Sequence, residues 1–283
     1  MRSRASPVLL ACAAALVAAG CGDGPSGLGK FDPSAPDDGV VVWAVGDGGE
    51  RDDDDRRVAR MIAGDDPERV IYLGDVYDTG TPEEFQEFAA VYGSLVERMW
   101  PTPGNHEWAN HATGYDPFWR SVLGRPLPHR YERRAAGWTV LSVNSETPDD
   151  PGQLRWLRSR AVGEGTCRIA FWHSPRFNAG KHRDEEIEVA GLWDAVAGRA
   201  AIVLSGHDHD LQRFRPVDGT VQYIAGAGGR GHHNVNEDDP RLAFSDDVTH
   251  GALRITLAPG SADLSFIAAD GTILDQSTVA CRG

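Results

Sequence analysis

Leu204-Ser205-Gly206-His207-Asp208-His209-Asp210 closes an apolar run that begins at Ala200. The run predicts a β-strand, and the carboxyl ends of strands are where α/β sheets collect their ligands. Residues two apart in an extended segment point to the same side, so His207 and His209 are expected to enter one pocket. Neutral imidazole is the commonest metal-donating side chain. On this stretch alone, a polar loop that merely contains two histidines stays open as the alternative.

Other polar side chains follow predicted strands in the same way: Asp47 after residues 39–45, Asp75 after 69–73, Asn105 after 98–100, and His173 after 168–172. Because successive strand ends meet at one rim of a sheet, all six side chains are expected to converge. Imidazole mixed with carboxylate and amide oxygen suits Fe, Mn or Zn better than Mg or Ca. Six donors exceed the needs of one open zinc site and fit two metals that share a carboxylate.

The order of predicted elements favours one domain built on two packed sheets. Helices are expected over residues 81–92, 153–161 and 184–196, between the strands already named. Near the C-terminus the helices stop, and Asp218-Gly219 is a hairpin signal between strands over 212–216 and 221–225. Further strands are expected over 252–257, 262–268 and 272–280. This pattern predicts an α/β (α+β) fold, a two-layer mixed β-sandwich flanked by helices.

The first 38 residues are expected to lie outside this domain. Residues 1–20 have the features of a signal peptide, because Arg2 and Arg4 precede an apolar stretch too short to span a bilayer. Small residues then precede Cys21, a pattern that resembles a bacterial lipoprotein signal in which this Cys is lipidated. Plain cleavage and secretion is the alternative. Residues 21–38 are rich in Gly, Pro, Ser and Asp and predict a flexible linker, which leaves 39–283 as the folded domain.

The charge and the cysteine content limit the possible functions of the protein and the compartments in which it can work. Lys and Arg number 28 against 42 Asp and Glu, so the net charge is −14, which argues against a nucleic-acid partner. A small phosphate stays compatible with this charge, because a bound metal supplies positive charge locally. The signal segment predicts an extracytoplasmic protein, secreted or anchored to the cell envelope only through its N-terminal lipid. In that oxidising compartment Cys167 and Cys281 are expected to form a disulfide, with two independent buried thiols as the alternative.

The motifs together, in this order, resemble the calcineurin-like metallophosphoesterases, most closely the purple acid phosphatase branch and related secreted bacterial members. The matching stretches are Asp47-Gly48-Gly49, Gly74-Asp75, Gly104-Asn105-His106-Glu107, Trp172-His173 and Gly206-His207-Asp208-His209. The resemblance covers residues from about 40 to 270. It implies a two-layer β-sandwich with helices on its outer faces, in agreement with the strand pattern.

The resemblance also implies a ligand set for two metal ions, Fe with Zn, Mn or a second Fe. Asp47 and His209 would bind the first ion, Asn105, His173 and His207 the second, and Asp75 would bridge them. One position departs from the family pattern, because the family's Tyr ligand stands three residues after the bridging Asp, where this chain has Asp78. Tyr77 would serve if the loop is one residue shorter. Otherwise Asp78 takes the position, or neither residue binds.

The activity implied is hydrolysis of a small phosphate ester by water activated between two metals. His106 resembles the family's general acid, with Glu107 or a nearby acid as its partner; a structural hydrogen bond is the alternative. Arg176 and His182 are candidates for binding the substrate phosphate, or else solvated loop residues, and His232 and His233 are equally open. A phosphomonoesterase of the acid phosphatase type is expected. The alternatives are a phosphodiesterase or nucleotidase of the same fold, and a lipoprotein that binds a ligand without catalysis.

Overall fold

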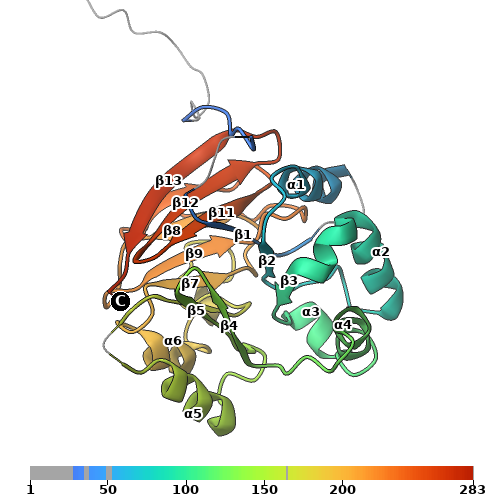
Figure 1. Ribbon diagram of the computed structural model, residues 1–283, viewed down its shortest axis with the longest axis horizontal. Coiled ribbons are helices and arrows are strands. Elements are labelled where there is room, and N and C mark those ends of the chain that lie inside the picture. The colour runs from blue at the N-terminus through green and yellow to red at the C-terminus, as the bar shows by residue number, and fades with distance from the viewer. Residues whose placement is uncertain (1–27, 35–37, 49–52, 164, 283) are drawn as a thin grey trace, which may run out of the picture.

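The computed structural model describes residues 28–34, 38–48, 53–163 and 165–282. Two β-sheets pack face to face and helices cover their outer faces (Figure 1), so the predicted sandwich is confirmed. The predicted signal peptide, the lipidation site at Cys21 and parts of the linker lie outside the described residues. Among the described helices, none combines the length and the apolar character needed to cross a membrane.

The first sheet contains six strands, and the three neighbouring strands at one side of it run parallel. The strands are β1 (Val40–Val45), β2 (Arg69–Tyr72), β3 (Met99–Pro101), β11 (Gly251–Ala258), β12 (Ser261–Ala268) and β13 (Ile273–Ala280). Their spatial order is β13-β12-β11-β1-β2-β3. Parallel pairing of β1, β2 and β3 brings their carboxyl ends to one rim, whereas β11 to β13 form an antiparallel meander beside β1.

The second sheet contains seven strands: β4 (Tyr131–Ala135), β5 (Trp138–Ser142), β6 (Arg168–Phe171), β7 (Ile202–Ser205), β8 (Leu211–Phe214), β9 (Val221–Ala225) and β10 (Leu242–Asp246). Their spatial order is β10-β8-β9-β7-β6-β5-β4, with parallel pairing from β5 through β6 and β7 to β9. β8 and β9 pair antiparallel across Asp218-Gly219, whose φ angles are 52° and 81°. Both residues thus adopt the left-handed backbone of a tight hairpin turn, as the sequence predicts.

Helices form the two outer layers: α1 (Asp53–Gly64), α2 (Pro82–Tyr92), α3 (Asn105–Trp108), α4 (Tyr115–Leu123), α5 (Pro151–Arg160) and α6 (Ala190–Val196), with the 3₁₀ turns η1 (Gly93–Arg98) and η2 (Arg183–Glu185). Figure 1 shows α1, α2 and α4 beside the first sheet, and α5 and α6 beside the second. The main apolar core fills the space between the sheets and under α1, α2 and α4. A second buried cluster, which includes Leu141, Leu157 and Leu192, lies under α5 and α6. The central strands are therefore buried on both faces, which explains their uninterrupted apolar runs.

One helical prediction needs correction, and a further helix was not predicted. The helix expected over 184–196 is broken into η2 and the short α6, and Ile187, within the expected range, is 69% exposed. The sequence does not predict α4, because its buried face consists of aromatic residues such as Tyr115 and Trp119 rather than a regular aliphatic stripe. The edge strand β10 is also absent from the prediction, since it pairs with β8 in a segment without clear apolar alternation.

Cys167 and Cys281 form a disulfide whose Cα atoms are 4.9 Å apart. Cys167 immediately precedes β6 of the second sheet, and Cys281 immediately follows β13 of the first. The bond therefore ties the C-terminus to the opposite sheet across a separation of 114 residues. A cross-link over so long a loop restricts the unfolded chain strongly.

Removing this disulfide should destabilise the fold. The Cys167→Ser/Cys281→Ser double variant is expected to lose about 2–5 kcal/mol of unfolding free energy, measured by urea denaturation. Thiol labelling of denatured, unreduced wild-type protein should leave both cysteines unmodified. Equal denaturation midpoints for the two proteins, or free thiols at both positions, would contradict the expected role.

The start of α2 depends on a buried carboxylate. Thr81 Oγ1 accepts the N–H of Glu84 at 3.2 Å, and the Glu84 carboxylate accepts the N–H groups of Thr81, Thr79 and Asp78 at 2.9, 3.1 and 3.3 Å. This is the capping box that the Thr81-Pro82-Glu83-Glu84 sequence indicates. Burial raises the pKa of Glu84, but the N–H donors of Thr81 and Thr79 outweigh burial and hold the pKa below its usual value.

Glu84→Gln is expected to lower the unfolding free energy by about 1–3 kcal/mol at neutral pH, because a neutral amide accepts these hydrogen bonds more weakly. A carboxylate with a lowered folded-state pKa stabilises the protein above its ordinary pKa, and this contribution disappears as pH falls through the folded-state value. The difference between the two proteins should therefore shrink in acid. Urea denaturation at neutral and acidic pH measures it, with the exposed Glu83→Gln as the control. A pH-independent difference would show that the charge of Glu84 is irrelevant.

Candidate metal centre

The structure brings six predicted side chains together at the carboxyl ends of the parallel strands. They are Asp47 after β1, Asp75 after β2, Asn105 after β3, His173 after β6, and His207 and His209 after β7. The first three come from one sheet and the histidines from the other. The site therefore forms only where the rims of the two sheets meet.

The backbone at these strand ends is locally strained. Asp47, Asp75 and His207 have φ angles of 57°, 59° and 71°, in the left-handed region that residues with a side chain rarely adopt. Such conformations cost of order 1–3 kcal/mol each and persist where the surrounding structure enforces them. Here they turn each side chain abruptly from its strand into the shared pocket.

His173 lies at the centre of the donor atoms. Its Nε2 is 2.9 Å from Asn105 Oδ1, 3.1 Å from His207 Nδ1 and 3.3 Å from Asp75 Oδ1. On the other side of the pocket, His209 Nε2 is 3.8 Å from Asp47 Oδ1. Both carboxylates are almost completely buried.

The second nitrogen of each histidine fixes which ring nitrogen carries the proton. Nδ1 of His173 donates to the Leu73 carbonyl at 2.8 Å, and Nδ1 of His209 donates to the Gly231 carbonyl at 2.8 Å. Nε2 of His207 donates to Glu185 Oε2 at 2.9 Å. These contacts leave His173 Nε2, His207 Nδ1 and His209 Nε2 facing the other donor atoms. Each of these nitrogens can offer a lone pair to a metal ion when its ring is neutral, as in histidines that bind metals.

This donor set fits metal cations. A lone pair on His173 Nε2 faces the oxygens of Asp75 and Asn105 and the lone pair of His207 Nδ1, an arrangement that is repulsive until a positive charge enters it. Burial alone would lower the pKa of His173, but Asp75 and Asp47 raise it well above its usual value. The field of the pocket thus favours a positive charge at that nitrogen, which two metal ions would supply.

Glycines make room for the carboxylates. A Cβ on Gly104 would lie 2.1 Å from Asp75 Oδ1, and a Cβ on Gly206 would lie 2.4 Å from Asp47 Oδ2. Any side chain at either position would displace a carboxylate. Burial raises the pKa of Asp47, whereas at Asp75 the neighbouring His173 and His106 outweigh burial and hold the pKa below its usual range.

His106 lies beside the donor atoms without joining them. Its Nδ1 donates to the Asp78 carbonyl at 2.7 Å, which leaves Nε2, 3.6 Å from Asp75 Oδ2, facing the pocket. Of the two partners expected for His106, Glu107 or a nearby acid, Glu107 makes no contact with the ring, and the nearby acid is Asp75. The Glu107 carboxylate is buried and accepts the N–H groups of Gly104 at 2.9 Å and Val76 at 3.1 Å. Burial, reinforced by Asp75, raises its pKa to about 7.

Neither Tyr77 nor Asp78 joins the donor atoms. The Tyr77 hydroxyl lies 3.4 Å from Asp55 Oδ2, and the ring lines a separate cavity against α1 and α2. Asp78 Oδ1 instead accepts from Arg230 Nη2 at 2.8 Å. Of the three alternatives at this position, the structure therefore supports the one in which neither residue binds metal, and the expectation for Tyr77 is corrected.

The pocket has a volume of about 380 Å³ and a cationic rim. Its lining includes the predicted His182, whose ring centroid is 4.2 Å from that of His207. It does not include Arg176, whose guanidinium stacks on Phe177 at 4.9 Å, so the expectation for Arg176 is also corrected.

Sequence reasoning missed two residues of this rim, Lys181 and Arg230, which line the pocket. His233, which the sequence left open as a candidate, also lines the pocket, with its Nε2 3.3 Å from Lys181 Nζ. Arg230 follows the Gly-rich segment after β9 and so lies near the end of another strand. The same rule that predicted the metal donors could therefore have identified Arg230 from the sequence. No sequence pattern around Glu185 indicates a role in the site, because its contact with His207 depends on the tertiary position of η2.

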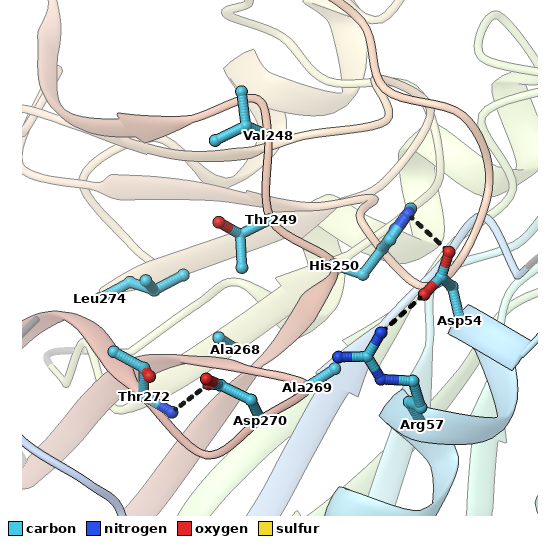
Figure 2. Close-up of a pocket in the computed structure, with 10 residues that line it drawn as sticks. All are labelled: Asp54, Arg57, Val248, Thr249, His250, Ala268, Ala269, Asp270, Thr272 and Leu274. Carbon is cyan, nitrogen blue, oxygen red and sulfur yellow. Dashed lines mark hydrogen bonds and ion pairs between the residues drawn. The ribbon is translucent and has the colours of Figure 1, made fainter. Parts of the chain in front are cut away.

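A second cavity, of about 360 Å³, lies between the start of α1 and the loops that flank β11 to β13 (Figure 2). Asp54 dominates its polar wall, where it accepts from Arg57 Nη1 at 3.2 Å and lies 3.5 Å from His250 Nε2. None of the predicted site residues lines this cavity. The predicted metal donors and His106 therefore lie at the rim where the two sheets meet, away from this cavity.

Comparison with known families gives one match, to the model described as "Calcineurin-like phosphoesterase", over residues 40–211. The matched region contains all six converging donors and His106. No curated protein matches the sequence.

Solved structures share the fold at low sequence identity. "GAP50 the anchor in the inner membrane complex of Plasmodium" has a TM-score of 0.71 and 10% identity, over 86% of this chain and 89% of that one. A purple acid phosphatase from yellow lupin seeds also has a TM-score of 0.71, with 14% identity over 87% of this chain and only 54% of its own. A dimetal phosphatase from Danio rerio has a TM-score of 0.58 and 14% identity, over 85% and 98% of the two chains.

Gly104→Ala should expose the importance of close packing around Asp75. The new methyl group collides with the carboxylate, so the variant is expected to bind fewer metal equivalents than the wild type. Elemental analysis after loading with Mn, Fe or Zn and desalting measures this. Gly64→Ala is the control, because nothing lies within 4 Å of a Cβ at that position. Full metal content in the Gly104 variant would mean that Asp75 is not a ligand.

Proposed function

The chain belongs to the calcineurin-like phosphoesterase family, whose members are metal-dependent phosphoric ester hydrolases, and we propose that it is a dinuclear-metal phosphomonoesterase exported from the cytoplasm. The observation that carries the proposal is the set of three imidazole lone pairs, two buried carboxylates and one amide oxygen aimed into one pocket beside His106.

The proposed ligands divide between two ions. Asp47 and His209 would hold the first, Asn105, His173 and His207 would hold the second, and Asp75 would contribute a carboxylate oxygen to each. When bound, two such ions polarise a phosphoryl oxygen and lower the pKa of a coordinated water. Iron paired with zinc, manganese or a second iron suits this mixed nitrogen and oxygen set. Because Tyr77 is turned away, we expect an iron-loaded protein without the colour of a tyrosinate-iron site.

His106 supplies the proton for the leaving alkoxide. The hydrogen bond from its Nδ1 to the Asp78 carbonyl fixes the ring, so Nε2 is the nitrogen that faces the pocket and delivers the proton. Asp78 is itself held by Arg230, through its carboxylate at 2.8 Å. A short chain of contacts therefore orients the acid.

The cationic rim favours a dianionic phosphate. Lys181 and Arg230 line the pocket in a protein whose net charge is −14. A phosphomonoester carries two negative charges and a diester carries one, so this rim attracts monoesters more strongly. The same fold would serve a diesterase if a substrate with two esterified oxygens also fits the pocket, which makes diester hydrolysis the second candidate activity.

The proposed location rests on the N-terminal segment and on the disulfide. Residues 1–20 have the composition of an export signal, and Cys21 is proposed as a lipidation site. The Cys167–Cys281 disulfide supports an oxidising compartment.

A non-catalytic role is the alternative from a different class. The structural neighbour GAP50 is an anchor in the inner membrane complex of Plasmodium, so a protein of this fold can serve as an anchor. In this chain, however, Asp75, Asn105, His207, His209 and the proposed acid His106 line one pocket. His173 lies beside Asp75 and His207, and Asp47 lies beside His209. A protein that only binds a partner has no need to keep this complete set, so the hydrolase is favoured.

The test is His106→Asn. Hydrolysis of phosphomonoesters with poor leaving groups should slow by about 10²–10⁴, whereas activated aryl esters should lose less, because their leaving groups need little protonation. Both metals should stay bound, since His106 is not a ligand. Rates for a series of aryl phosphates, together with elemental analysis, measure both effects, and parallel assays with an aryl diester decide between the two ester classes.

His250→Asn, outside the pocket, is the control for this series and should match the wild type. Equal losses for good and poor leaving groups would show that His106 only orients the substrate. The proposed function would be wrong if the wild-type protein binds two metals but hydrolyses neither monoesters nor diesters.

A further inference from the structure

A second group of metal-binding side chains lies outside the catalytic pocket. His111, Asp116 and His129 each place one donor atom within 4.8 Å of the others. The other groups of this kind in the described part of the chain all include His207 or His182, which line the catalytic pocket. This group shares no residue with that pocket, and the proposed function assigns it no role.

One carboxylate joins the two imidazoles. Asp116 Oδ2 is 3.0 Å from His111 Nδ1, and Asp116 Oδ1 is 2.8 Å from His129 Nε2. The three residues come from separate segments: the turn after α3, the first turn of α4, and the bend directly before β4. The N–H of Asp116 also donates to the His111 carbonyl at 2.8 Å, so the backbone fixes the relative position of two of the donors.

Trp108 holds both imidazole rings in place. Its indole stacks on His111 with centroids 4.2 Å apart and an interplanar angle of 14°, and it meets His129 edge to face at 5.0 Å and 82°. The donors are therefore positioned by packing before any ion arrives. Preorganisation of this kind lowers the entropy cost of binding.

The chemistry of the group suits zinc. Two imidazole nitrogens and one carboxylate form the three-ligand set of open zinc sites, with a fourth position for water. Calcium and magnesium need more oxygen ligands than this cluster offers. The side chains of His111, Asp116 and His129 are 32%, 31% and 35% exposed, so an ion and its water reach them from solvent.

We propose that His111, Asp116 and His129 bind one Zn²⁺ ion in a site separate from the catalytic pocket. Each neutral imidazole then carries its proton on the nitrogen that faces away from Asp116 and gives its other lone pair to the ion. The ion joins the turn after α3 to α4 and to the chain before β4. α3 begins with Asn105 and His106, and His111 lies in the turn that follows it. Zinc would therefore restrict the motion of the segment that directly follows these two site residues.

The test counts zinc equivalents. Full-length wild-type protein, stripped with a chelator, is loaded with excess Zn²⁺, desalted and analysed for zinc. His129→Gln should bind one equivalent less than the wild type. His250→Gln is the matched control, because His250 also lies beside a carboxylate, that of Asp54 (Figure 2), but belongs to none of the three-donor groups among the described residues. It should bind as much zinc as the wild type.

The difference of one equivalent holds whatever number of ions the catalytic pocket retains, so this result is independent of the proposed function. His129→Gln should keep the circular dichroism spectrum and the cooperative urea transition of the wild type, which shows that it is folded. Should it fail to fold, His111→Gln removes the other imidazole of the site and should also bind one equivalent of zinc less than the wild type. Equal zinc content in the wild type and in a folded variant of either histidine would overturn the proposal and leave a hydrogen-bonded His–Asp–His cluster.

Discussion

Buried negative charge at the meeting point of the two sheets is the constraint on which the rest of the site depends. Asp47 is fully buried and Asp75 is 2% exposed. Their ion-pair partners among the described residues are imidazoles, His209 for Asp47 and His106 and His173 for Asp75. Two carboxylates in a low-dielectric pocket cost several kcal/mol each unless cations compensate them. Metal binding and the stability of this rim are therefore expected to be coupled.

The same contacts that prepare the metal donors also join the two sheets. His173 comes from the second sheet, yet its Nδ1 donates to the carbonyl of Leu73 at the end of a strand in the first. The N–H of His207, also from the second sheet, donates to both Asp47 oxygens at 3.1 and 2.9 Å. Glycines at positions 74, 104 and 206 permit this approach, because a Cβ at any of them would collide with a neighbouring residue. The sandwich and its functional site are thus stabilised by one set of interactions.

The sequence predicted the residues that follow the strands, but among the loop residues it was right for His182 and wrong for Tyr77 and Arg176. Apolar runs fix where a strand ends, so Asp47, Asp75 and His173 follow from local pattern alone. The direction of a loop side chain depends on backbone angles that the tertiary structure sets. Tyr77 has a φ of 60° and turns toward Asp55, and Arg176 turns onto Phe177. The helix expected over 184–196 is likewise broken, and in η2 the partly exposed Glu185 carboxylate contacts His207.

Glu107 shows how far a motif can mislead about roles. Its place next to His106 suggests a carboxylate that orients the imidazole, yet it holds the backbone of Gly104 and Val76 and so fixes the two segments that carry Asn105 and Asp75. A backbone carbonyl orients His106 instead, without adding a charge beside it. The nearest charge is Asp75, 3.6 Å from Nε2. Asp75 would also bridge the metals, so its substitution would change metal binding and proton delivery together. Only a variant of a residue outside the ligand set can change proton delivery while metal binding stays the same.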